Sequence, residues 1–372
     1  MAEIAPVKVG ILVDYVEGSE HVDPMVDRVF RLAFDEYLTA GVLERPVELV
    51  LRAAQGLPNG SFRAVRDAFD ELVAEDCVAI FGPYVSENGE PLRRYVEELA
   101  EVPILTMAGT ESMLGEWVFA LNNGSMEEEP IIMAAVCRHD GRQSVGIAYE
   151  HSLIGQEYLA TCRRACVEAG LRITGEVAIP QVATEKRVAM EQLREGNPDA
   201  IVHVGFGLGL LGMNEALEAI GWMPPRYTTT AFEFAHGSDS WMQQLAGWVG
   251  LDSFDERNPV GKAFLDRYEA RYGDRPEYFM PVYCYDMARM IALAIAGAKP
   301  LTGTGVKEAL EHVKMVPAAS GAPGTRMRFG RFIRQGWMGA EYLVARRVLP
   351  DASRTVFHGT IEGSLGPAER LP

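Results

Sequence analysis

Short runs of β-branched and other apolar residues alternate along this chain with longer stretches whose apolar residues recur every three to four positions. The first short run is Val7 to Val13, and the stretch from Asp23 to Ala40 follows it. The apolar face of that stretch comprises Val26, Val29, Phe30, Ala33, Phe34 and Tyr37. Such alternation is typical of β-α units that build a parallel sheet covered by helices on both faces. We therefore expect an α/β fold.

The β-α units form two successive series. The first series predicts further strands at Val47–Arg52, Val78–Gly82 and Pro103–Met107, with helices near 62–74 and 90–100. The second predicts strands at 144–149, 171–179, 200–205 and 227–231. A chain of 372 residues is long enough for two domains, each with its own core. We expect two lobes, each a doubly wound parallel sheet.

The chain is expected to pass between the lobes about three times, near residues 122, 250 and 328, so that three connecting strands form a hinge. The first lobe then comprises 1–122 and 251–328, and the second comprises 123–250 and a final strand pair at 329–348. Pro, Gly and Ser accumulate without periodicity in 349–372, which predicts a loosely held tail.

The charge of the chain is strongly acidic. There are 35 basic and 52 acidic residues, which gives a formal net charge of -17. A field of this sign repels phosphate backbones and anionic headgroups, so nucleic acid is not expected as a partner. The sequence also shows no stretch near the ~20 apolar residues of a membrane helix, so membrane insertion is not expected.

The start of the sequence, Met1 to Pro6, lacks a charged segment followed by an apolar one. Such a pair of segments marks an export signal. Because the first strand already begins near Val7, we expect a cytoplasmic protein if this start is native. The alternative is a periplasmic or cell-surface protein from which a signal has been removed.

The five cysteines, at 77, 137, 162, 166 and 284, form no CxxC pair and no set with histidines at zinc-ligand spacing. No metal site is expected. Cys162 and Cys166 share a helical face at i, i+4, and we interpret all five as reduced residues with a packing role.

A helix start is predicted at Ser125 to Glu128, which matches a capping box. We interpret the acidic run from Glu127 to Glu129 as complementing the positive end of the helix dipole. No further role is expected for this run.

Glycines at 205, 207, 209 and 212 follow a buried strand, and Gly207, Gly209 and Gly212 match GxGxxG. A dinucleotide fold needs this loop after its first strand and an acid at the end of the next strand. Neither condition holds, so we expect the glycines to let the backbone approach a ligand or the opposite lobe. A nucleotide-dependent enzyme that uses the Gly207 loop is the competing interpretation. No phosphate-loop, zinc-protease or nucleophile-elbow motif occurs, and we assign no catalytic residue and no cofactor.

Polar and aromatic residues follow the carboxyl ends of the predicted strands, which is where open α/β sheets bind ligands. Those of the first lobe are Asp14, Tyr15, Tyr84, Ser86, Gly109 and Thr110, and those of the second are Tyr149, Phe206, Phe232 and Glu233. Two facing sets predict a hinged clamp around a small ligand.

Several short motifs carry a family resemblance that spans residues 7 to 348. They are Phe81-Gly82-Pro83 with Ser86, Val102-Pro103-Ile104 leading to Ala108-Gly109-Thr110, Ile147-Ala148-Tyr149 with Gly155, Tyr285-Asp286, and Ser320-Gly321 with Phe329. In order and spacing the chain resembles the leucine/isoleucine/valine-type, or type I, periplasmic binding proteins. The resemblance implies two hinged α/β lobes that capture a solute.

In that family a Ser and a Thr hold the ligand carboxylate and an acid holds its ammonium. By position these residues are Ser86, Thr110 and Glu233. The second lobe departs from the family pattern, because Leu153-Ile154 and Gly207-Leu208 replace aromatic or hydroxyl groups. The resemblance therefore implies a solute-binding protein for an amino acid, an amide or an apolar carboxylic acid. It acts in ABC-type uptake with a permease, or in sensing as a cytoplasmic ligand-responsive regulator with a regulatory protein.

Overall fold

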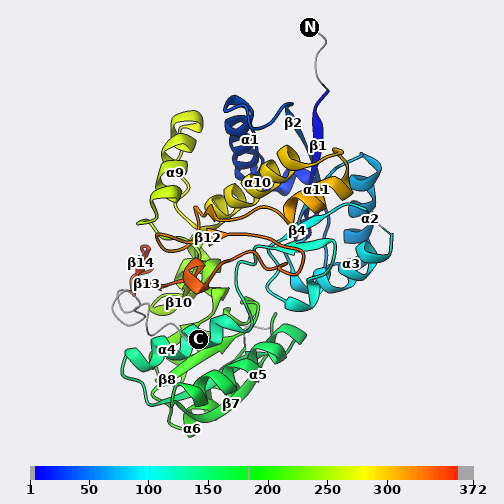
Figure 1. Ribbon diagram of the computed structural model, residues 1–372. Helices are drawn as coiled ribbons and strands as arrows, with labels where there is room; N and C mark the ends of the chain where they lie inside the picture. The colour runs from blue at the N-terminus through cyan, green and yellow to red at the C-terminus, as the bar shows by residue number, and fades with distance from the viewer. Residues whose placement is uncertain (1–4, 100, 183–184, 359–372) are drawn as a thin grey trace. The chain divides into compact units, whose positions relative to one another are not determined.

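The computed structural model describes residues 5–99, 101–182 and 185–358. In it the chain forms two compact units, each made of two separate segments (Figure 1). Unit 1 comprises the chain up to Asn123 together with Phe254–Tyr342. Unit 2 comprises Gly124–Ser253 together with the chain from Leu343 onward.

Unit 1 contains a five-stranded sheet in the order β2-β1-β3-β4-β5, in which all neighbouring strands are parallel. Its strands are β1 (Val7–Val13), β2 (Val47–Ala53), β3 (Ile80–Phe81), β4 (Ile104–Thr106) and β5 (Val118–Ala120). The helices are α1 (Pro24–Thr39), α2 (Phe62–Ala74), α3 (Ser86–Leu99), α9 (Pro259–Tyr272), α10 (Phe279–Gly297) and α11 (Gly303–Leu310), with 3-10 turns η1 (Ser19–His21), η2 (Glu111–Met113) and η5 (Ala340–Tyr342). The predicted parallel α/β fold is confirmed.

Helix α1 illustrates how the local sequence sets an element. Pro24 is the first residue of the helix. The side chain of Asp23 caps the helix N-terminus by accepting a hydrogen bond from the Met25 amide at 2.9 Å. Its apolar face packs on the sheet, where the Phe30 ring lies 5.1 Å from the ring of Phe81. Helices α2 and α3 contribute Phe69 and Leu92 to a second apolar cluster of unit 1.

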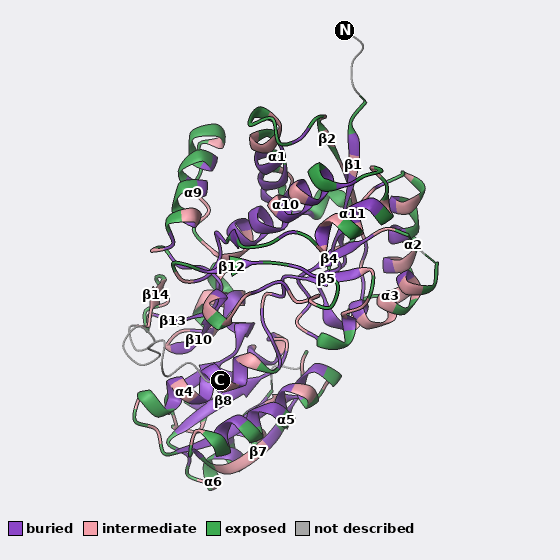
Figure 2. Ribbon diagram, viewed as in Figure 1, coloured by how far each residue is buried: buried purple, intermediate pink, exposed green. Residues whose placement is uncertain are grey.

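In the part of the chain that the structure describes, one helix, α10, is long and apolar enough to cross a membrane. No such stretch was expected from the sequence. In the protein α10 is a core helix, because 72% of its most apolar window is buried, and it lies beside α1 (Figure 2).

The segment 329–342 belongs to unit 1, whereas the sequence analysis had placed it in a strand pair of the second lobe. Aromatic packing explains the difference. The Phe329 ring contacts that of Phe119 at 5.1 Å, and Trp337 stacks on Tyr342 and donates from Nε1 to the Asn122 carbonyl at 2.8 Å. Immediately before it, β11 (Val316–Pro317) and β12 (Arg326–Met327) form an antiparallel ribbon.

Unit 2 contains a seven-stranded sheet in the order β14-β13-β10-β9-β8-β6-β7. Its parallel strands are β6 (Ser144–Glu150), β7 (Arg172–Ile179), β8 (Ala200–Val204), β9 (Arg226–Thr228) and β10 (Trp248–Asp252), and β13 (Val344–Val348) and β14 (Thr355–Phe357) add antiparallel pairs. The helices are α4 (Glu128–His139), α5 (Leu153–Glu168), α6 (Arg187–Glu195), α7 (Met213–Ala219) and α8 (Asp239–Gln244), with 3-10 turns η3 (Leu208–Leu210) and η4 (Thr230–His236).

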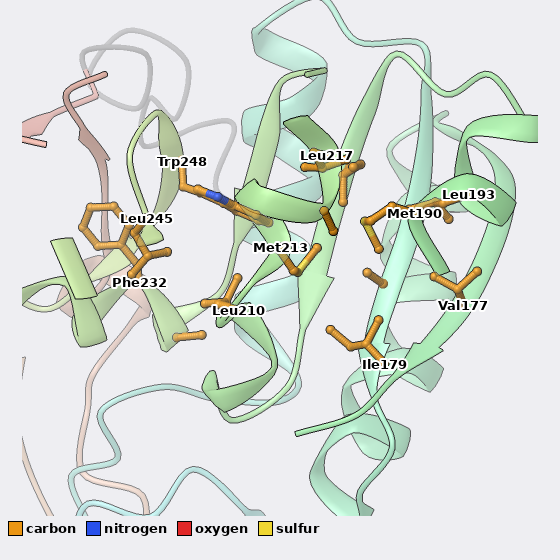
Figure 3. Packing of buried hydrophobic residues seen from close by; sticks show 14 of the residues in the cluster. Val177, Ile179, Met190, Leu193, Leu210, Met213, Leu217, Phe232, Leu245 and Trp248 are labelled. Carbon is orange, nitrogen blue, oxygen red and sulfur yellow. The ribbon is translucent and has the colours of Figure 1, made fainter. Parts of the chain in front are cut away.

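A cluster of buried apolar side chains in unit 2 lies where α6, α7 and the turn after α8 pack on the sheet (Figure 3). Met190 and Leu193 of α6 meet Val177 and Ile179 of β7, and Trp248 closes the cluster at β10. The Trp248 indole donates to Asn214 Oδ1 at 2.9 Å, so its polar atom is satisfied inside the core.

The first part of the predicted loose tail, up to residue 358, includes a regular strand. Strand β14 pairs with β13, and the His358 ring lies 3.0 Å from an oxygen of Asp140. Residues 359–372, the rest of the predicted tail, lie outside the described residues. A short antiparallel strand satisfies the outer edge of β13, which an unstructured tail would leave unpaired.

The two sheets share one strand order. In unit 1 the first strand lies between the second and third, and in unit 2 strand β6 lies between β7 and β8 in the same way. Strand order therefore reverses beside β1 and β3 in unit 1, and beside β6 and β8 in unit 2. Ligands of open α/β sheets bind at the carboxyl ends of strands at such switch points.

Candidate functional site

The switch point of unit 1 is organised by Asp14, the residue after β1. Its Oδ1 accepts from the Tyr84 amide at 2.7 Å, and its Oδ2 accepts from the Val85 amide at 3.2 Å and from Asn88 Nδ2 at 2.8 Å. Burial raises the pKa of Asp14 to about 6, although these donors oppose the shift. Asp14 therefore ties the end of β1 to the loop that follows β3.

The aromatic residues Tyr15 and Tyr84 lie together at this switch point. Their rings meet edge to face at 5.3 Å, and Tyr15 is 41% exposed whereas Tyr84 is buried. Burial raises the pKa of Tyr84 well above its usual value. Within the described residues the Tyr84 hydroxyl has no hydrogen-bond partner, which is unusual for a buried polar atom.

Ser86 and Thr110 follow adjacent strands of the same sheet. Ser86 is buried and begins α3, and Thr110 is buried and caps η2 by accepting from the Ser112 amide at 3.3 Å. The two loops are joined by Thr106, whose hydroxyl donates to the Pro83 carbonyl at 2.6 Å and accepts from the Ala108 amide at 3.0 Å. Gly109 lies between these contacts and is half-buried.

The switch point of unit 2 is organised by Glu150, the last residue of β6, which the sequence analysis did not single out. Oε1 accepts from the amides of Gly207 at 2.8 Å and Gly209 at 2.7 Å, and Oε2 accepts from the Phe206 amide at 3.0 Å. Despite burial, the pKa of Glu150 is lowered, because the nearby His203 ring and these amides favour the carboxylate.

The glycine motif is explained by this carboxylate. A Cβ at Gly205 would lie 2.4 Å from Glu150 Cγ, and one at Gly209 would lie 2.7 Å from the same atom. A Cβ at Gly207 would lie 2.7 Å from the Phe234 ring. The close approach of the backbone is therefore to side chains of its own unit, whereas we had expected a ligand or the opposite lobe.

The four other residues predicted for the second lobe lie in different environments. Tyr149 lies within β6 and is half-buried, and the Phe206 ring packs edge-on against Phe234 at 5.5 Å. Phe232, which the sequence predicted as a ligand-binding residue, is fully buried in the core cluster, where its side chain packs against Gly250. Glu233 is buried and accepts from the Ser253 amide at 3.2 Å and hydroxyl at 3.0 Å.

Glu129 is a further buried acid that the sequence analysis misinterpreted. It accepts from the Tyr158 hydroxyl at 2.6 Å and from the Thr230 amide at 2.6 Å, and burial raises its pKa to about 7. The Ser125 hydroxyl accepts from the amides of Glu127 and Glu128, as expected of the first residue of the predicted capping box. Glu129 thus fixes the loop after β9. The acidic run at 127–129 is the one sequence feature that drew attention to this residue.

The described residues contain no group of three or more His, Cys, Asp or Glu side chains that could hold a metal ion. All five cysteines are buried and none is in a disulfide. The Sγ atoms of Cys162 and Cys166 lie 4.0 Å apart on α5.

Comparison with protein families identifies one model, described as periplasmic binding protein, that matches residues 6–340. This match covers most of the chain, including both units. A search of curated proteins found no match. The family match also overturns the predicted cytoplasmic location, because the family consists of periplasmic proteins. The residues at the start of the sequence therefore gave a wrong indication of location.

Solved structures share the fold at low sequence identity. A leucine binding protein from Thermotoga maritima is 18% identical with a TM-score of 0.77, and the match covers 95% of this chain and 98% of that one. A branched-chain amino acid transporter substrate binding protein from Streptococcus pneumoniae, in complex with isoleucine, is 18% identical with a TM-score of 0.70 over 88% and 97% of the chains. A solute binding protein from R. palustris, in complex with 4-hydroxybenzoate, is 18% identical with a TM-score of 0.73 over 92% and 93%.

The shared strand order, the paired switch points and the family match lead to the same assignment. The predicted resemblance is confirmed, as is the general role of capturing a small solute. This chain belongs to the periplasmic binding protein family.

Proposed function

We propose that the chain captures a small apolar or aromatic carboxylic acid for uptake by an ABC permease. The ligand would contact Tyr15, Tyr84, Ser86, Gly109 and Thr110 of unit 1 and Tyr149 and Phe206 of unit 2. The chain passes from one unit to the other near residues 123, 253 and 342.

The observation that carries this choice of ligand is the hydrogen bonding of four buried carboxylates beside the loops that follow the strands. Asp14, Glu150, Glu129 and Glu233 each accept hydrogen bonds from backbone or side-chain donors of the protein. A carboxylate that is already bound by such donors is poorly placed to receive a ligand ammonium. The other side chains at these edges include the exposed Tyr15 ring and the hydroxyls of Ser86 and Thr110, which suit an acid without an ammonium.

Two solved neighbours from R. palustris support this ligand class. One is a solute binding protein in complex with 4-hydroxybenzoate and the other is in complex with benzoate. The second neighbour has a TM-score of 0.73 at 14% identity. The apolar pair Leu153-Ile154 at the start of α5 is also consistent with a ligand of low polarity.

We further propose that the protein performs no chemistry on its ligand. The competing interpretation, a nucleotide-dependent enzyme, requires the glycine loop to receive a phosphate. In this chain the Gly207 and Gly209 amides donate to Glu150, and a buried carboxylate at that position repels a phosphate. The family of solute-binding proteins supports the same proposal.

A second candidate ligand is an α-amino acid of the leucine type. Neighbours described as leucine binding or as bound to isoleucine favour it, as does Glu233, which takes the position of the ammonium-binding acid in the family resemblance. This candidate requires Glu233 to accept from the ligand while it also holds Ser253.

A thermal-shift series decides between these ligand classes, because a ligand that binds only the native state must stabilise it. The probes are benzoate, 4-hydroxybenzoate, benzamide, leucine and isoleucine. We expect both aromatic acids to raise the Tm, and benzamide, their neutral counterpart, to have a much smaller effect. At a ligand concentration of about 100 Kd the stabilisation is about 2.7 kcal/mol. If only leucine and isoleucine raise the Tm, the ligand is an amino acid and not an aromatic acid. If no probe raises the Tm, both ligand classes are rejected.

A further inference from the structure

The glycine loop of unit 2 surrounds a carboxylate of the protein itself. Three backbone amides, those of Phe206, Gly207 and Gly209, donate to the two oxygens of Glu150, which is fully buried. A fourth donor, Gln181 Nε2, lies 3.2 Å from Oε2. Successive amides that converge in this way form an anion-binding nest, and here the anion is covalently part of the chain.

The loop geometry requires this internal anion. Gly205 and Gly207 have φ values of 154° and 128°, which other residues rarely adopt. Without Glu150, three convergent N–H groups would lose their acceptor, and each unsatisfied buried donor is costly. The carboxylate is thus the group that stabilises this backbone conformation.

Unit 1 repeats the arrangement with different residues. Asp14 follows β1 as Glu150 ends β6, and it accepts from the Tyr84 and Val85 amides after β3 as Glu150 accepts from the amides after β8. Position 82 requires glycine for the same reason, since a Cβ there would lie 2.1 Å from the Leu12 carbonyl oxygen. Equivalent strands of the two sheets therefore carry equivalent anchors.

We propose that Glu150 is a positioning residue for ligand capture, which fixes the loop 205–209 in its binding conformation before the ligand arrives. Asp14 has the same role for the loop 82–85. The inference rests on the proposed function, since it assumes that these loops face the ligand. A loop that is already ordered loses less conformational entropy on binding, so the ligand binds faster and more tightly.

The first test needs no ligand and uses hydrogen exchange of the Phe206, Gly207 and Gly209 amides. We expect Glu150→Gln to accelerate exchange at these amides, because an amide side chain presents a donor where the carboxylate presented an acceptor. In Glu150→Ala, added formate should restore protection by filling the nest. Glu176→Gln is the matched control. It removes one negative charge from the adjacent strand β7, where Glu176 pairs with Arg163.

The second test measures association of 4-hydroxybenzoate, or of isoleucine if the thermal-shift series selects the amino acid. Glu150→Gln should weaken binding about 10- to 150-fold, mainly through a slower association rate, whereas Glu176→Gln should bind like the parent. Unchanged exchange at the three amides, or faster exchange with unchanged ligand kinetics, would overturn the positioning role.

The two proposals can fail separately. If none of the probes binds the parent protein, the proposed ligand class fails, while exchange and formate rescue still decide whether Glu150 holds the loop. If Glu150→Gln does not fold, Glu150→Asp replaces it, because the shorter side chain keeps the carboxylate but reaches the Phe206, Gly207 and Gly209 amides less well. It should produce the same two effects at smaller size, and the absence of both would overturn the proposal.

Discussion

The Tyr158 hydroxyl of α5 donates to Oε1 of Glu129 in the first turn of α4 at 2.6 Å, and both groups are buried. Through Oε2 the same carboxylate receives the Thr230 amide, so one side chain connects two helices to the loop after β9. This carboxylate is close to the point at which the chain enters unit 2, because a Cβ at Gly124 would lie 2.0 Å from its Oε1.

Tyr158→Phe should destabilise the protein more at pH 8 than at pH 5. Burial raises the pKa of Glu129 from 4.5 to about 7, so its contribution to stability is present in full below pH 4.5 and is lost as the pH rises through 7. At pH 8 the variant loses a bond to a charged group, about 1.5–3 kcal/mol, and at pH 5 a bond to a neutral one, about 0.5–1.5 kcal/mol. Urea unfolding at both pH values measures this, with Tyr149→Phe as control. Equal losses at the two pH values would contradict the prediction.

Gly250→Ala should destabilise unit 2 by about 1–3 kcal/mol, the usual range for overpacking. The new methyl group would lie 2.3 Å from Phe232 Cβ, inside the core cluster. Gly175→Ala in the same sheet is the matched control, because the nearest atom there is 3.7 Å away. Thermal unfolding of the two variants should separate them, and similar midpoints would mean that Phe232 can move aside.

Asp286→Asn should cost about 3–5 kcal/mol, the range for breaking a buried ion pair. The carboxylate accepts from the Ala319 amide at 2.8 Å and the Ser320 amide at 2.9 Å and pairs with Arg289. Asp266→Asn removes a pairing of an exposed acid with Arg275 and should cost about 0–1 kcal/mol. Guanidinium unfolding gives both free energies, and a small loss in Asp286→Asn would show that Arg289 does not depend on this carboxylate.

Ser86→Ala and Thr110→Ala should each weaken binding of 4-hydroxybenzoate about 10- to 150-fold, the loss of one hydrogen bond to a charged group. Binding of the neutral 4-hydroxybenzamide should change less. Ser61→Ala, which removes the cap of α2, should affect stability without affecting affinity. Calorimetry with all three variants tests this, and unchanged affinity in both site variants would place the ligand elsewhere.

Glu233→Gln should distinguish the two ligand classes. The change removes the negative charge but keeps a side-chain oxygen that can accept from Ser253. Affinity for an aromatic acid should change little, whereas affinity for isoleucine should fall sharply if Glu233 binds its ammonium. A large loss with 4-hydroxybenzoate would indicate that Glu233 acts on the hinge.

Periodicity predicted the long elements well, because burial of one face is a local property of the sequence. The predicted stretch from Asp23 to Ala40 is α1, and most of its predicted apolar face is buried. Strands β5 and β10 were missed because each is short or lies beside a point where the chain passes between units. The segment 329–342 was misplaced because stacking of Trp337 on Tyr342 leaves no sign in a strand pattern.

The candidate site was predictable only in outline. The ends of strands could be found from sequence, and so could Tyr15, Tyr84, Ser86 and Thr110 as residues that follow them. The three backbone amides that donate to Glu150 lie more than fifty positions away, and no local pattern connects them with it. The burial of Phe232 in the core could not be predicted, because the 3-10 turn that directs its ring inward depends on contacts with β10.

Each unit is built from two segments that alternate along the chain, and this constrains when each unit can fold during synthesis. Unit 1 requires α10, which packs against α1, and unit 2 requires β13, which pairs with β10. Nascent domains fold as they emerge, with the first domain usually first. Here neither core is complete until residues near 340 have been synthesised, so the two units should acquire stable structure almost together at the end of translation.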